Sequence, residues 1–375
     1  MSAAYLVAAR RTAVAPRGGA FKAVEVDELG AAPIRAVLAD TGIAPEAIDD
    51  VIFGNALYGG GNPARLAVLR AGLPDHVSAL TIDSQCCGGL DAIMLAAERI
   101  ASGGADAVIA GGVESFSRAP LRARRPRHAD EAPQPYDRPP FAPWPERDPD
   151  MIAAAATLAE RFDISRARQD EFAIGSHCKA LQNPPGSAEI VPLAGLSRDA
   201  FPRRLTEATC ARLAPLAGDV AFGVTRATVA VEADAAAALL VVSETMARRL
   251  NARRPLRIVA AVRRGGDPAM PGTAPIAAAE RLLAAQRIAP MQIAVAEVME
   301  AFAAQAIACV DGIGVPEFSL NRGGGALARG HPIGASGAIL AARLWHEMQS
   351  ESPGAMGLAA IAAAGGLGSA LLVTV

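Results

Sequence analysis

A cysteine and a histidine are the residues of this sequence whose surroundings best suit covalent chemistry. Cys86 lies where a short expected strand gives way to an expected buried helix. A cysteine at a helix N-terminus lies beside free N–H groups and the positive end of the helix dipole, which favour the thiolate and can hold an oxyanion. Gly88 and Gly89 predict room for the close approach of a substrate. Cys87 occupies nearly the same place, so the local pattern leaves two candidate nucleophiles.

His331 is the histidine in the most unusual stretch of the chain, the glycine-dense segment 321–337. Such a loop costs much conformational entropy to order, which indicates that some group must come close to it. A cysteine and a histidine together are the smallest set of nucleophile and base for acyl transfer. The weaker candidates, in exposed-looking or helical contexts, are His76, His128, His177 and His346.

The elements that must position these residues alternate between strand and helix patterns, which predicts an α/β fold. Strands are expected at 3–9, 50–54, 80–83 and 105–111, and helices at 29–41, 64–71 and 90–102. After 235, a helix is expected to end near 250, and strands are expected at 256–262 and 293–298. Further helices are expected at 276–286, from 302 onward, and in a separate segment that ends near 347. A strand pair is expected to close the chain around 365–375. Segments 106–112 and 358–366 resemble each other, which suggests a weak internal duplication.

The segment 119–150 breaks the alternation, because arginines and prolines replace the apolar pattern. Helices are expected again at 151–162 and 165–181, followed by loops to about 223. We therefore divide the chain into an N-terminal half at 1–118, completed by about 235–255, an inserted loop domain at 119–240, and a C-terminal half at 256–375.

Composition excludes several classes of function. The chain has 375 residues, 51% hydrophobic and only 4% aromatic, so it is too large for a simple binding module and must build its core from Ala, Val, Leu and Ile. The formal charge of -2 argues against nucleic acid, and the apolar stretches are too short or too rich in Ala and Gly to span a membrane. Five cysteines without metal-ligand spacing argue against disulfides and zinc. We expect a cytoplasmic protein without a bound metal.

Several segments together resemble the thiolase family over nearly the whole chain. The first, 81–90, reads Thr-Ile-Asp-Ser-Gln-Cys-Cys-Gly-Gly-Leu and corresponds to the run ending in the family's acylated cysteine. The others are 62–65, 71–74, 111–115, 160–162, 169–172, 300–305 and 330–337. The resemblance implies a thiolase-like fold of two similar α/β/α/β/α halves with an inserted loop domain, assembled as a homodimer or homotetramer.

The resemblance also implies roles for single residues. Its register assigns the nucleophile to Cys86 rather than Cys87, and the base to His331. The backbone N–H groups of Cys86 and Ala364 would hold the oxyanion, and Glu300 would line the site as part of the 300–305 segment. The expected substrate is an acyl-CoA or acyl-carrier thioester, with no further cofactor.

The sequence departs from the family in the machinery of the second half-reaction. Ala362 stands where the family has a second cysteine, and Met299 stands where it has an Asn or His. A methyl group and a thioether can neither take a proton nor donate a hydrogen bond, and each loss costs on the order of 10²-fold in rate. The coenzyme-contact regions at 150–152 and 227–231 depart as well, so coenzyme-binding residues stay unassigned.

Three functions are compatible with this pattern. The first is an acyltransferase that forms an acyl-thioester on Cys86 and passes the acyl group to an activated nucleophile or to a carbanion made by decarboxylation. The second is a conventional acetyl-CoA acetyltransferase or 3-ketoacyl-CoA thiolase in which Cys87 or Cys309 replaces the missing base. The third is a non-catalytic, degenerate thiolase subunit that serves as a structural or acyl-holding partner in a complex with a companion subunit.

Overall fold

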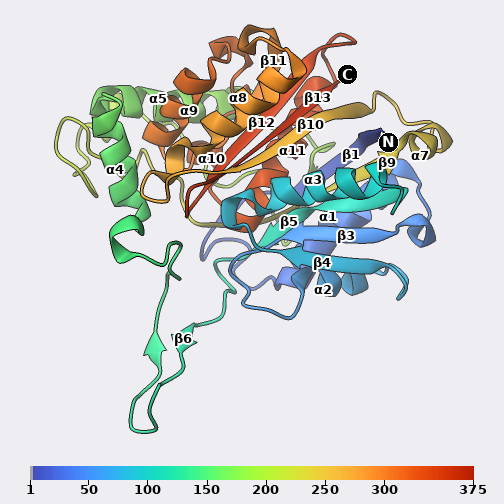
Figure 1. The fold of residues 1–375 in the computed structure, drawn as a ribbon, viewed down its shortest axis with the longest axis horizontal. Coiled ribbons are helices and arrows are strands. Elements are labelled where there is room, and N and C mark those ends of the chain that lie inside the picture. Colours follow the sequence, from blue (N-terminus) through green and yellow to red (C-terminus); the bar gives the residue numbers. More distant parts are fainter. Residues whose placement is uncertain (1–2) are drawn as a thin grey trace.

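The computed structural model describes residues 3–375, and its main sheet runs through the whole molecule in the order β11-β12-β13-β10-β1-β9-β5-β3-β4 (Figure 1). These strands are β1 (Ala4–Thr12), β3 (Asp50–Gly54), β4 (Ser78–Ile82), β5 (Ala107–Glu114), β9 (Ala233–Ser243), β10 (Leu256–Gly265), β11 (Ile293–Val298), β12 (Met356–Ala363) and β13 (Leu367–Thr374). Two short strands, β2 (Ala15–Pro16) and β8 (Ile190–Val191), pair at its margin. β1 and β10 join only through the pairs Tyr5 with Arg257 and Leu6 with Leu256, so the sheet consists of two halves.

The two halves repeat one topology. In the order β1-β9-β5-β3, the successive pairs are antiparallel, antiparallel and parallel, and the order β10-β13-β12-β11 repeats this pattern. The register even shifts at the same place, between Leu6 and Ala8 in β1 and between Ile258 and Ala260 in β10. The similar sequence segments lie in β5 and β12, which occupy equivalent positions, so the expected duplication is confirmed in the fold.

Helices form three layers around the two half-sheets (Figure 1). α3 (Gly88–Ala101) and α11 (Ile333–Met348) pack against each other in the middle. α1 (Val26–Thr41) and α2 (Pro63–Ala71) cover the outer face of the N-terminal half, and α8 (Ala274–Gln286) and α9 (Ala303–Ile313) cover that of the C-terminal half. The predicted α/β/α/β/α architecture is therefore confirmed, and its central layer is rich in alanine, which lets helices and strands approach closely.

The inserted region supplies the remaining larger elements. α4 (Met151–Arg161) and α5 (Arg166–Gln182) agree with the predicted helices, and α6 (Glu207–Cys210) is short. Two further short helices, α7 (Glu244–Arg249) and α10 (Ala326–Arg329), lie outside the inserted region. The arginine-rich segment forms an exposed arm whose strands β6 (Ala123–Arg124) and β7 (Gln134–Pro135) pair only with each other, and it projects from the body (Figure 1). No helix of residues 3–375 combines the length and the apolar character needed to cross a membrane.

Several element boundaries differ from the sequence-based expectation, and β9 was not among the expected strands. β9 begins at Ala233, before the expected end of the inserted domain at 240, and all of its residues are buried because the strand lies inside the sheet between two helical layers. The closing strand pair begins earlier than 365, because Gly365 and Gly366 form the turn between β12 and β13. Their φ angles of 76° and 79° suit glycine at this turn.

The glycines beside the candidate nucleophile have a different role from the expected one. A β-carbon at Gly89 would lie 2.5 Å from the backbone nitrogen of Ala338, and one at Gly334 would lie 2.6 Å from the Cα of Asn55. Gly54 likewise faces the backbone of Gly88 without room for a side chain. The expectation of space for a substrate at Gly88 and Gly89 was wrong, since Gly88 faces the backbone of Gly54 and Gly89 lets the N-terminal part of α3 pack against the backbone of α11.

We therefore expect Gly89→Ala to destabilise the protein by about 2–3 kcal/mol, because the added methyl group overlaps main-chain atoms that have no room to move. Gly175→Ala in α5 is the matched control, since nothing lies within 4 Å of its added β-carbon, and it should stabilise by about 0.5–1 kcal/mol. Urea unfolding of both variants measures the difference. Equal effects of the two substitutions would contradict this account of the helix contact.

Candidate active site

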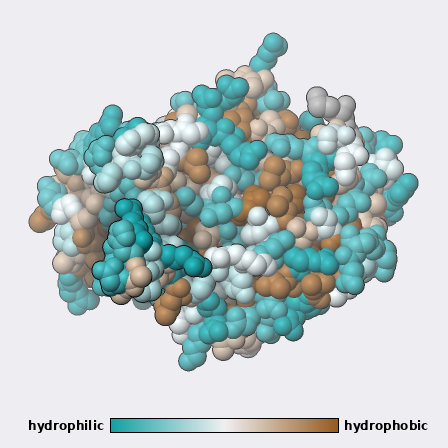
Figure 2. All heavy atoms as spheres, turned by 60° about the horizontal axis from the view of Figure 1, so that its bottom comes forward, coloured by the Kyte–Doolittle hydropathy of each residue, from teal (hydrophilic) through white to brown (hydrophobic). Residues whose placement is uncertain are grey.

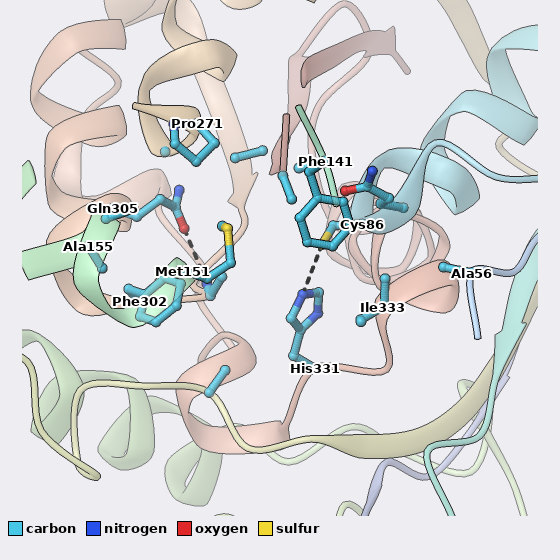
Figure 3. A pocket seen from close by; sticks show the side chains of 18 of the residues that line it. Ala56, Cys86, Phe141, Met151, Ala155, Pro271, Phe302, Gln305, His331 and Ile333 are labelled. Atoms are coloured by element: carbon cyan, nitrogen blue, oxygen red, sulfur yellow. Dashed lines mark hydrogen bonds between the residues drawn. The ribbon is translucent and has the colours of Figure 1, made fainter. Parts of the chain in front are cut away.

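Cys86 and His331 meet although 245 residues separate them in sequence, with 3.2 Å between Sγ and Nε2 (Figure 3). Cys86 lies in the 3-10 turn Gln85–Cys87 that leads into α3, and His331 lies two residues before α11. Each half therefore presents one reactive residue at the N-terminus of its central helix, and the backbone contact of α3 and α11 brings the two residues together.

The turn before Cys86 is strained. Gln85 has a φ angle of 56°, in the left-handed region that residues with a β-carbon avoid, at a cost of about 1–2 kcal/mol. Its N–H group donates to Asp83 Oδ1 at 2.9 Å, which holds the turn. Backbone strain is concentrated at functional positions in many proteins, and here it immediately precedes the candidate nucleophile.

Ser336 fixes the orientation of the imidazole, a role that the sequence analysis missed. His331 Nδ1 lies 2.7 Å from Ser336 Oγ, whose single hydroxyl proton is directed to the carbonyl oxygen of Pro332 at 3.2 Å. The hydroxyl oxygen then accepts from Nδ1–H, which leaves the Nε2 lone pair facing the thiol. The position of Ser336 in the first turn of α11, one turn after the histidine loop, was the available signal.

Burial shifts the pKa values of both members of the pair toward their neutral forms. It raises the pKa of the Cys86 thiol to about 12; the N–H groups of Cys86 and Ala364 oppose this rise, whereas the nearby carboxylate of Glu114 adds to it. Burial also lowers the pKa of His331 to about 4. Both shifts oppose the thiolate that the helix terminus favours, so we expect attack by Sγ to be accompanied by transfer of its proton to Nε2.

The pair opens into a cavity of about 360 Å³ (Figure 3). Its wall is largely apolar: Ala56, Leu57, Pro139, Pro140, Phe141, Met151, Ala154, Ala155, Leu158, Val229, Ala230, Pro271, Gly272, Ala301, Phe302, Ile333, Ala362, Ala363 and Ala364. Besides the pair, its polar side chains are Asp83, Gln85, Arg122 and Gln305. The two alanines expected at the site, Ala362 and Ala364, are thus on the wall.

Met299 and Glu300 do not line this cavity, so their expected place on the site wall was wrong. The Met299 side chain packs into the central core, only 1% exposed. The buried Glu300 carboxylate needs hydrogen-bond donors, and it accepts from Ser176 Oγ at 2.6 Å, Asn321 Nδ2 at 2.7 Å and the N–H of Leu327 at 3.2 Å. Glu300 therefore braces the loop that precedes His331.

No second thiol reaches the cavity within residues 3–375. Cys87 Sγ faces the carbonyl oxygen of Ile361 at 3.6 Å. Cys309 Sγ lies 3.2 Å from the carbonyl oxygen of Gly272 and 3.3 Å from Gln305 Nε2, and burial raises its pKa to about 12. Neither geometry offers a base to a substrate in the cavity.

The segments 150–152 and 227–231, which correspond to the family's coenzyme contacts, carry residues that cap a helix or line the cavity. Asp150 Oδ1 accepts from the N–H groups of Ile152 and Ala153 at 2.9 and 3.1 Å and so caps α4. Val229 and Ala230 present apolar side chains to the cavity. In the described part of the chain, His, Cys, Asp and Glu side chains form no group of three or more suited to a metal ion.

Comparison with known proteins agrees with this fold. Residues 4–245 match the thiolase N-terminal domain, and residues 253–375 match the thiolase C-terminal domain. The chain therefore belongs to the thiolase family, a family of acyltransferases.

Individual relatives are similar over their full length. The chain is 37% identical to the "Putative acetyl-CoA C-acetyltransferase VraB" of Staphylococcus aureus, covering 100% of both chains. It is also 37% identical to the protein of that name from Staphylococcus epidermidis, covering 99% of this chain and 98% of the relative. The crystal structure of the Bacillus anthracis acetyl-CoA acetyltransferase superimposes with a TM-score of 0.89 at 30% identity, covering 100% and 99% of the two chains.

The raised pKa of the Cys86 thiol predicts that its rate of alkylation depends steeply on pH. Alkylation of Cys86 by iodoacetamide should accelerate about tenfold per pH unit from pH 7 to pH 10, because the thiolate fraction rises in that proportion well below a pKa of about 12. Peptide mass spectrometry measures the rate, with the exposed Cys178 as an internal reference. A plateau in the Cys86 rate below pH 9 would refute a neutral resting pair.

Proposed function

We propose that Cys86 takes an acyl group from a coenzyme A or carrier-bound thioester and passes it to a second substrate. The contact between Cys86 Sγ and His331 Nε2 is the observation that supports this most strongly. An exposed or isolated cysteine is only a weak nucleophile, whereas a thiol in contact with an oriented imidazole can lose its proton as it attacks.

In the acylation step, Sγ attacks the thioester carbonyl carbon while Nε2 of His331 takes the thiol proton. The carbonyl oxygen becomes an oxyanion, for which the N–H groups of Cys86 and Ala364 are available, since both lie close enough to the sulfur to lower the thiol pKa. Collapse breaks the bond to the donor sulfur, and the departing thiolate takes the proton back from His331. An acyl-cysteine and a free thiol result.

The second half-reaction differs from that of a complete thiolase. Ala362 offers a methyl group to the cavity, and Met299 is packed in the core, so neither position supplies a base or a hydrogen-bond donor. We therefore expect the acceptor to bring its own reactivity, as an activated nucleophile or as a carbanion released by decarboxylation.

The names of the relatives support a second candidate, a conventional acetyl-CoA acetyltransferase. This activity requires a base that replaces the missing cysteine, and the buried Cys87 and Cys309 do not serve that need. Thiolysis of acetoacetyl-CoA separates the two candidates.

A homodimer or homotetramer is also expected. β4 is an edge strand close to Cys86 in sequence and in space, and large apolar side chains are exposed on it and on α2: Leu66, Leu69 and Leu80. Hydrophobic side chains gather on the face that turns forward in Figure 2, beside the hydrophilic arm. A second subunit would cover such an edge.

Incubation with a panel of acyl-CoA and acyl-N-acetylcysteamine thioesters should add one acyl mass to the protein. Cys86→Ala should abolish the adduct, and Cys178→Ala, which changes an exposed cysteine outside the cavity, should retain it. Intact-mass spectrometry measures both. Absence of an adduct with every thioester would rule out the proposed acylation.

Restoring the missing thiol tests the second half-reaction. Ala362→Cys should raise thiolysis of acetoacetyl-CoA at least about tenfold over the parent, because it puts a proton-accepting group on the cavity wall. Ala363→Cys, at the neighbouring wall position, is the control and should give no such gain. A parent enzyme that already catalyses rapid thiolysis, unimproved by Ala362→Cys, would favour the conventional acetyltransferase.

A further inference from the structure

Glu114 is a buried carboxylate that the acylation chemistry does not use. It ends β5 with no exposed surface and accepts four hydrogen bonds. Oε1 accepts from Asn55 Nδ2 at 2.9 Å and the N–H of Leu57 at 3.3 Å, and Oε2 accepts from the N–H groups of Ala56 and Gly334 at 2.9 Å each. All these donors are uncharged, which is unusual for a fully buried acid.

The donors belong to both walls of the cavity. Ala56 and Leu57 line it from the N-terminal half, directly after β3. Gly334 lies three residues after His331 at the start of α11, next to the wall residue Ile333. One carboxylate thus fastens the loop of one half to the histidine-bearing segment of the other.

The charge of Glu114 works against the nucleophile. Burial raises the pKa of Glu114 to about 7, although the N–H groups of Ala56, Gly334 and Leu57 counteract this rise. As an anion, Glu114 raises the pKa of the Cys86 thiol and so disfavours the thiolate. Glu114 is costly to bury, and its charge disfavours the thiolate of Cys86, so its contribution to the site must be a different one. Its four hydrogen bonds, which reach both walls of the cavity, are such a contribution.

We propose that Glu114 is a positioning residue, which sets the distance between Cys86 and His331 by fastening the 55–57 loop and the N-terminus of α11 to the end of β5. This role rests on the proposed function of Cys86. Gly112 in the same strand faces the Gly334 backbone without room for a side chain, so β5 holds α11 at two points.

Glu114→Gln tests position and charge together, because they have opposite effects. Its amide group puts N–H donors against N–H donors, so bonds to at least one wall are lost. The rate of acyl-adduct formation should fall about 10- to 100-fold, since small misplacements of reacting groups cost that much. Alkylation of Cys86 by iodoacetamide at pH 8 should instead accelerate, because removal of the negative charge lowers the thiol pKa.

Asn55→Ala separates the two effects. It removes one donor and leaves the carboxylate, so it should slow acylation without accelerating alkylation. Asp234→Asn is the structural control: Asp234 is equally buried, lies on the adjacent strand β9, and binds Ser115 and Ser117 rather than the cavity walls. It should leave both rates of the folded protein unchanged. Simultaneous alkylation of the buried Cys210 and Cys309 would reveal unfolding in any variant.

The outcomes distinguish this role from the proposed function. Adduct formation by folded Glu114→Gln within twofold of the parent would overturn the positioning role and leave acylation of Cys86 intact. The same loss of rate in Asp234→Asn would reduce Glu114 to a structural residue. If the parent forms no adduct, the proposed function fails, and the positioning role fails with it.

Discussion

The meeting of two helix N-termini, backbone against backbone, is the constraint on which the site depends. α3 and α11 come from different halves of a duplicated fold, and each carries one reactive residue just ahead of its first turn. Gly89 and Gly337 lack the β-carbons that would hold the helices apart. A separation of 3.2 Å between Sγ and Nε2 is therefore a property of tertiary packing, which depends on glycines at the contact of the two helices.

This packing also sets the electrostatics of the site. A nucleophile at the centre of a five-layer fold is removed from water, and burial outweighs the favourable N–H groups at the helix terminus. Burial therefore favours a neutral thiol beside a neutral imidazole, and in the proposed acylation charge would develop only as the thioester carbonyl is attacked. The apolar wall of the cavity supports such chemistry, because it strengthens the few N–H groups directed at the reacting atoms.

The sequence was most informative where local pattern decides structure. The strand before Cys86, the helix after it and the glycine-rich histidine loop follow from periodicity and turn chemistry, and the predicted pair does meet in space. Side-chain direction was less accessible: Glu300 belongs to a recognisable segment, yet its carboxylate turns away from the cavity to satisfy donors on α5 and the loop at Asn321. Long-range pairing such as that of Glu114 with Gly334 leaves no local trace in a single sequence.

The weakness of His331 as a base bears on which half-reactions the cavity supports. Taking a proton from a thiol that is simultaneously forming a bond to carbon requires less basicity than taking one from carbon, and the imidazole of His331 is in contact with the sulfur. Abstracting a proton from the carbon next to a thioester demands a far stronger base, and the methyl group of Ala362 offers none. Met299, packed in the core outside the wall, offers no donor for the enolate oxygen that would form. The positions of the family's second cysteine and of its Asn or His thus both carry side chains without acid–base or donor chemistry, which supports the proposal that the acceptor supplies its own nucleophile.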